Sequence, residues 1–156
     1  MSTRHIELEG MIGIDDVRDV RKLVETLHHR FVHNLDDVSR VAMATHELLE
    51  NAVKFSVDGK TKLRIELVSS GRIRITTRNR ALPANVEELT NLAQEFRDAI
   101  DPMLLYVDLM RRTPIDKLGG LGLGRVAAEG EMTIGLDLDG DFVQVFAEAT
   151  LAEPAA

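Results

Sequence analysis

Three polar side chains that could address a metal-bound nucleotide share one face of a predicted helix. The helix is expected over residues 36–56, DDVSRVAMATHELLENAVKFS. Glu47, Asn51 and Lys54 stand at positions i, i+4 and i+7, so they fall on one side of it. A carboxylate, an amide and a cation in this order suit a nucleotide whose phosphates hold a metal ion. The alternative is an ordinary solvated helix face, where these residue types are common.

The other side of the same helix is mostly apolar, which predicts that the helix packs on a core. The residues of this side are Val38, Val41, Thr45, Leu48, Leu49 and Ala52. The rest of the chain is therefore expected to be organised around this helix.

A glycine run at residues 119–124, GGLGLG, is the second unusual stretch, with four glycines in six residues. It is predicted to form a loop that opens a short helix over residues 125–129. Such a loop can present backbone N–H groups to a phosphate, although glycine-rich turns also serve as hinges. It is not a P-loop, because Arg125 follows in place of Lys-Ser/Thr. Because the segment before it is predicted to be helical, it is not a Rossmann fingerprint either.

Length and composition predict one soluble globular domain. The chain has 156 residues, of which 44% are hydrophobic and 29% charged. It has no cysteine, which excludes disulfides, thiolate chemistry and a zinc site built on cysteine. The net charge of −7 disfavours a nucleic-acid partner. No apolar run is long enough to span a bilayer and the N-terminus lacks a signal-peptide core, so a cytoplasmic protein without a membrane partner is expected.

The remaining periodicities predict an α+β fold, a two-layer α/β sandwich whose mixed, mostly antiparallel sheet has helices on one face. A first helix is expected to run to about residue 31, with histidines near its end that favour the negative end of the helix dipole. Residues 85–112 are predicted to be two helical pieces broken at Asp101-Pro102, and residues 151–156 to be a frayed tail. The expected strands are 4–9, 62–68, 72–78, 132–138 and 142–149.

The helix and the glycine run together resemble the GHKL (histidine-kinase-like) ATPase superfamily. HELLENAVKFS at residues 46–56 is similar to its N-box, and residues 120–124 to its second glycine box. The order and spacing agree over residues 5–150. The small size, without dimerisation helices or a sensor region, is most similar to the anti-sigma-factor serine kinase branch, which acts by partner switching in bacterial signal transduction.

The resemblance implies ATP and Mg²⁺ as cofactors and a Bergerat-type fold. It implies that Asn51 ligates Mg²⁺, that Glu47 is the general base, and that Lys54 faces the phosphates. The helical insertion 85–118 would act as a mobile lid, together with the three glycines that cover the phosphates, Gly120, Gly122 and Gly124.

One stretch departs from the family pattern. The first glycine box, an Asp followed by Gly-x-Gly, should fall near residues 78–83, which read RNRALP. Asn79 stands about where the adenine-reading Asp belongs, and its amide is a mixed donor and acceptor. Asn79 is alternatively a strand-end turn residue. Arg78 and Arg80 are expected to fill space that small residues leave for the nucleotide.

Three functions are compatible with these residues. The first is a regulatory protein-serine kinase that phosphorylates a small antagonist protein and thereby controls a sigma factor. The second is a non-catalytic pseudo-kinase module that sequesters such a partner on the same fold. The third is a small-molecule-binding α+β domain with accidental motif matches.

The helical insertion is predicted to be an ordered helical pair, packed on the domain or across a homodimer interface. Buried core is the plainer alternative for its apolar residues. The expected contacts are Met103, Leu104, Tyr106, Val107 and Met110.

Overall fold

A computed structural model of the chain describes residues 3–30, 32–68, 71–113 and 119–152. The strands are β1 (Thr3–Met11), β2 (Lys60–Val68), β3 (Arg72–Arg80), β4 (Thr133–Asp139) and β5 (Phe142–Thr150). The helices are the 3-10 turn η1 (Ile14–Asp16), α1 (Val17–His28), α2 (Leu35–Phe55), α3 (Pro83–Asp98), α4 (Pro102–Arg112) and α5 (Gly119–Ala128).

The five strands form one sheet in the order β1-β2-β3-β5-β4. Every pairing between them is antiparallel, so the sheet is more regular than the mixed one expected. The β4–β5 hairpin turns at Asp139-Gly140 as predicted, and Gly140 takes the positive φ of 61° that favours glycine there.

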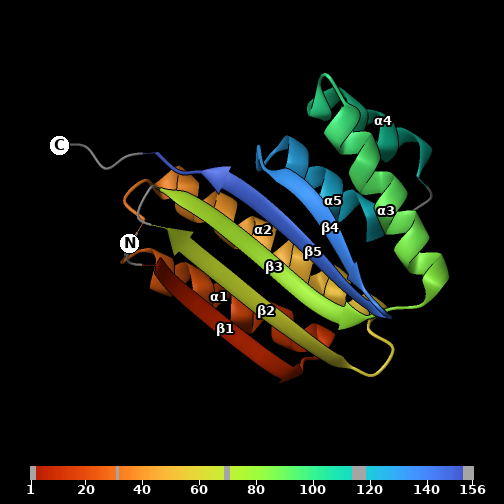
Figure 1. The fold of residues 1–156 in the computed structure, drawn as a ribbon. Helices are drawn as coiled ribbons and strands as arrows, with labels where there is room; N and C mark the ends of the chain where they lie inside the picture. Colours follow the sequence, from red (N-terminus) through yellow and green to blue (C-terminus); the bar gives the residue numbers. More distant parts are fainter. Residues whose placement is uncertain (1–2, 31, 69–70, 114–118, 153–156) are drawn as a thin grey trace.

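The expected two-layer α+β architecture is confirmed. In Figure 1 helices α1, α2 and α5 lie behind the sheet, and α3 and α4 stand beside its β4 edge. The opposite face of the sheet carries none of the described helices. This face is called the open face below, and the helix-covered face is called the inner face.

The core lies between α2 and the inner face. The predicted apolar side of α2 is at most 5% exposed, as are four inward residues of β2 and β3. These core residues are Val38, Val41, Thr45, Leu48, Leu49 and Ala52 on α2, with Leu63, Ile65, Ile73 and Ile75 on the strands. None of the described helices is long and apolar enough to cross a membrane.

The start of α2 also forms a hydrogen bond with the segment that follows β5. Asn34 caps the helix by accepting hydrogen bonds from the N–H groups of residues 36 and 37. The buried carboxylate of Asp37 accepts from the Arg40 guanidinium at 2.8 Å and from the Ala152 N–H at 2.7 Å. Leu151 is buried, so the predicted frayed tail begins later than residue 151; residues 153–156 lie outside the described part.

The end of α1 differs from the expectation. The helix ends at His28, earlier than about residue 31, and this ring is buried rather than turned to solvent. Its Nδ1 lies 2.7 Å from the Val24 carbonyl oxygen. Burial lowers the pKa of His28, which favours the neutral ring and not the cation that a helix dipole would attract.

The helical insertion is an ordered pair of helices, as predicted, and α3 and α4 both contact α5. Tyr106 is buried, which agrees with the plainer alternative. Met103, Leu104 and Met110 are 42%, 68% and 45% exposed. Their contribution to a homodimer stays a prediction, and residues 114–118 of the predicted lid lie outside the described part.

Candidate functional site

Helix α5 packs directly on the two principal residues of the predicted site. A Cβ added at Gly122 would lie 2.6 Å from Glu47 Oε2 and 3.5 Å from Asn51 Nδ2. A side chain at this position would have to displace the Glu47 carboxylate, whereas glycine leaves that carboxylate in place. The structure therefore brings Glu47, Asn51 and Gly122 together, as the sequence predicts.

The glycine run is helical, which corrects the expected loop. Helix α5 begins at Gly119, so Gly120 lies in its first turn and not in a phosphate-covering loop. Tertiary packing outweighs the poor helix propensity of glycine here, because Leu123 and Val126 on this helix are at most 1% exposed. Gly124 faces α3 and α4, and a Cβ added there would lie 2.9 Å from ring atoms of Phe96 and Tyr106.

Arg125 on α5 forms an ion pair with the carboxylate of Glu47. Its Nη1 lies 3.2 Å from Glu47 Oε1, and its Nε lies 2.9 Å from Glu129 Oε2. The hydrogen bond to Glu129 and then that to Glu47 raise the pKa of the guanidinium. The pair with Arg125 engages one of the two carboxylate oxygens of Glu47, Oε1. The sequence interpretation noted Arg125 only as a departure from the P-loop.

A small cavity lies between α2, α5 and the inner face, and three polar residues line it. These are Asn51, Thr77 and Asn79, among apolar neighbours that include Leu123. The space that could take the centre of a water-sized molecule is about 10 Å³, roughly enough for one water. Among the described residues, the buried Asn51 Nδ2 and Thr77 Oγ1 have no hydrogen-bond partner. Thr77 was missed from the sequence because it reads as an ordinary strand residue.

Asn79 belongs to the sheet and is not a strand-end turn residue. It is 3% exposed, pairs with Val143 across β3 and β5, and donates from Nδ2 to the Arg80 carbonyl oxygen at 3.1 Å. Arg78 and Arg80 alternate with it along β3 and face the open side. They therefore do not fill the nucleotide space, which corrects the sequence expectation.

Lys54 is exposed and does not line the cavity; its Nζ lies 5.8 Å from the centre of the Phe55 ring. Lys54 shares a helix face with Glu47 and Asn51, as the spacing predicts, but it is not among the residues that line the cavity.

Among the described residues, the cavity beside Asn51 is too small for ATP in this conformation, and ATP as a cofactor stays a prediction. The cavity has polar atoms suited to a nucleotide, yet its volume is far below the roughly 300–1,000 Å³ of ligand pockets. In the described part, no group of three His, Asp or Glu side chains is placed to hold a metal ion. Ligation of Mg²⁺ by Asn51 stays a prediction. A nucleotide would need α5 to move away.

Comparisons with known proteins agree on the fold. One chain in the crystal structure of the SiaB–SiaC complex from Pseudomonas aeruginosa matches with a TM-score of 0.74 at 14% identity, over 92% of this chain and 88% of that one. Full-length ShkA in complex with AMPPNP matches with a TM-score of 0.51 at 18% identity, over 95% of this chain and 32% of that chain. No protein-family model matches the chain, and no curated protein matches it significantly. Likenesses at these identities show the fold alone.

Proposed function

We propose that this chain is a regulatory signalling protein on a GHKL-like fold that acts by binding a small regulatory protein, with its nucleotide site closed under α5. The observation that carries the proposal is the packing of Gly122 and Arg125 on Glu47 and Asn51. Gly122 lies against both residues on which phosphoryl transfer would depend, and Arg125 pairs with one of them, Glu47.

Two further features support a binding role. The inner cavity is too small for a nucleotide, and the carboxylate needed as a base is held in an ion pair. The likeness to a chain from the SiaB–SiaC complex extends over nearly the whole of both chains, and that structure holds two proteins. A small protein antagonist is therefore the favoured partner. Control of a sigma factor and formation of a homodimer stay predictions from the sequence.

A protein-serine kinase that uses ATP and Mg²⁺ is the second candidate. It is favoured by the unpartnered Asn51 Nδ2 and Thr77 Oγ1, because buried polar atoms without partners are costly and point to a polar ligand. This candidate requires α5 to leave Glu47 and Asn51, which would then take the roles that the family resemblance implies.

Calorimetric titration with ATP and ADP, with and without Mg²⁺, separates the two candidates. We expect no saturable heat at millimolar nucleotide for the wild type, because α5 closes the site. Asn51→Ala tests the cavity, and Ser39→Ala is the matched control, because Ser39 is exposed on the same helix and does not line the cavity. Saturable Mg²⁺-dependent binding that Asn51→Ala abolishes and Ser39→Ala retains would overturn the closed-site proposal in favour of the kinase.

A further inference from the structure

The open face of the sheet holds a groove of a different character from the inner cavity. The basic groove, as we call it, is lined by four cations, Lys60, Lys62, Arg78 and Arg80, and by Phe142. By the same measure that gives about 10 Å³ for the inner cavity, its volume is about 550 Å³. This lies within the range of small-ligand pockets.

The sheet itself brings these cations together. Lys62 pairs directly with Arg78 across β2 and β3, and alternate residues of a strand point to the same face. Lys60 and Arg80 therefore stand beside them, one step nearer the end of the sheet. Two carboxylates, Glu9 and Asp58, also line the groove, so cations outnumber them two to one in a chain whose net charge is −7.

Phe142 orients the two arginines. Their guanidinium carbons lie 4.4 Å (Arg78) and 4.8 Å (Arg80) from the centre of its ring. A guanidinium stacked on an aromatic face keeps its N–H groups at the edge, where they can form paired hydrogen bonds with an oxyanion. The two forks are thereby pre-arranged before any ligand arrives.

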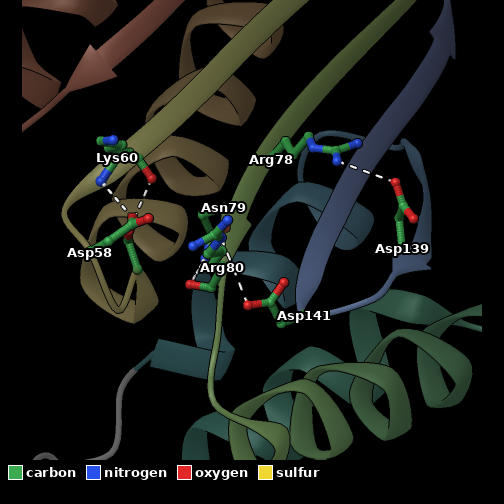
Figure 2. A network of polar contacts seen from close by, with 8 residues as sticks. Asp58, Lys60, Arg78, Asn79, Arg80, Asp139 and Asp141 are labelled. Atoms are coloured by element: carbon green, nitrogen blue, oxygen red, sulfur yellow. Dashed lines mark hydrogen bonds and ion pairs between the residues drawn. The ribbon is translucent and has the colours of Figure 1, made fainter.

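The ion pairs that these two arginines form with aspartates are weak enough to leave the guanidinium groups available to a ligand. Figure 2 shows Arg78 directed toward Asp139 and Arg80 toward Asp141, on either side of the β4–β5 turn. The ion-pair distances are 3.3 Å and 3.7 Å, and the two aspartates are 76% and 67% exposed. Such solvated pairs are weak and are readily exchanged for a stronger anion.

The two lysines of the groove differ in their acidic neighbours. Among the described residues, the exposed Lys60 ammonium forms no ion pair, whereas Lys62 reaches Glu7 at 3.7 Å. A multiply charged ligand can therefore contact Lys60 without breaking an ion pair.

We propose that the basic groove binds the phosphoryl group of a phosphorylated ligand. The phosphoryl dianion matches two stacked guanidinium forks and two ammonium groups. Its source is either a free phosphate ester or a phosphorylated side chain of a protein. The inference is independent of the proposed function, because the groove lies on the opposite face of the sheet from Glu47 and Asn51.

The experiment is calorimetric titration of the full chain with inorganic pyrophosphate. Wild type is expected to bind saturably, and the double variant Arg78→Gln/Arg80→Gln to bind about tenfold more weakly or worse, as expected for the loss of charged hydrogen bonds. Asp139→Asn/Asp141→Asn should bind more tightly than wild type, because it removes the competing carboxylates. Urea denaturation checks that the variants fold.

Two control variants test whether the loss of pyrophosphate affinity arises from the groove. Arg72→Gln/Arg74→Gln removes two charges from the other end of β3, where both pair with Glu148, and should leave the affinity unchanged. Asn51→Ala should also leave it unchanged, which separates this test from that of the closed nucleotide site. No saturable binding by the wild type, or equal weakening by the two arginine pairs, would overturn the proposal.

A second titration identifies the source. Ribose 5-phosphate represents a free ester, and a glycine-rich peptide with one phosphoserine represents a protein side chain. Tighter binding of either ligand supports the proposal and identifies the source of the phosphoryl group. Equal binding of the phosphorylated and unphosphorylated peptides, together with no binding of ribose 5-phosphate, would contradict it.

Discussion

The two faces of the sheet differ most where β3 ends, and alternate residues of one strand serve both. Thr77 and Asn79 line a closed cavity of about 10 Å³ on the inner face. Arg78 and Arg80 line an open groove of about 550 Å³ on the other. The sequence RNR, interpreted as one degenerate glycine box, is therefore part of two separate sites. Neighbouring residues of a strand face opposite sides of the sheet, so a departure from a motif on a strand has to be interpreted separately for each face.

The inner face should dominate stability, and neighbouring residues of β3 test this. Ile75 is fully buried, so Ile75→Ala should lower the free energy of unfolding by about 2–5 kcal/mol. Arg74, on the open face, stacks on Phe146 and pairs with Glu148, and Arg74→Ala should cost about 1 kcal/mol or less. Urea denaturation measures both. Equal losses would contradict the difference between the faces.

Two glycines of α5 should respond differently to alanine. At Gly124 a Cβ meets ring atoms of Phe96 and Tyr106 at 2.9 Å, and Gly124→Ala should lower the free energy of unfolding by about 1–3 kcal/mol. At Gly122 it meets the movable end of Glu47, so the gain in helix propensity of about 1 kcal/mol should offset most of the cost. Thermal denaturation of the two variants compares them, and the reverse ranking would show that α5 does not pack as described.

The helix layer also contains a buried titratable ring, which predicts a pH dependence. Burial lowers the pKa of His28 in the folded chain, whereas an unfolded histidine takes up a proton near pH 6.5. Below that pH the unfolded state binds more protons, so stability falls with falling pH by at most about 1.4 kcal/mol per pH unit. Unfolding measured from pH 8 to 5 should show this decline in the wild type, and His28→Gln should reduce it. The exposed neighbour variant His29→Gln is the control, and a decline that His28→Gln leaves intact would assign it to other groups.

The smallest effect on stability is expected at the α5 ion pair. Arg125 is 41% exposed and Glu47 18% exposed, so Arg125→Ala should change the free energy of unfolding by less than about 1 kcal/mol. Arg111→Ala, at an exposed position of α4, is the reference substitution. A loss of several kcal/mol measured by urea denaturation would mean that the pair, and not the packing of Leu123 and Val126, holds α5 in place.

The sequence predicted the architecture well because periodicity reports burial. The apolar side of α2, the hairpin at Asp139-Gly140 and the break at Asp101-Pro102 all depend on neighbouring residues alone. The candidate site was predicted in part: Glu47, Asn51, Asn79 and Gly122 do converge on one region.

The rest depended on contacts between distant segments. Local propensity disfavours a helix through GGLGLG, and only the packing of α5 on α2, α3 and α4 makes it form. The pairing of Arg125 with Glu47 joins residues 78 positions apart, which no local pattern reports. The basic groove likewise arises from the register of β2 with β3 and from the position of Phe142 on β5.

Hydrogen exchange of the α5 amides tests the closed inner site most directly. The amides of Leu123 and Val126 should exchange slowly, because both residues are buried against α2, and millimolar ATP with Mg²⁺ should leave that protection unchanged. Exchange near the rate of an unstructured chain, or a clear loss of protection on adding nucleotide, would show that α5 opens. Either result would contradict the closed site and favour the kinase.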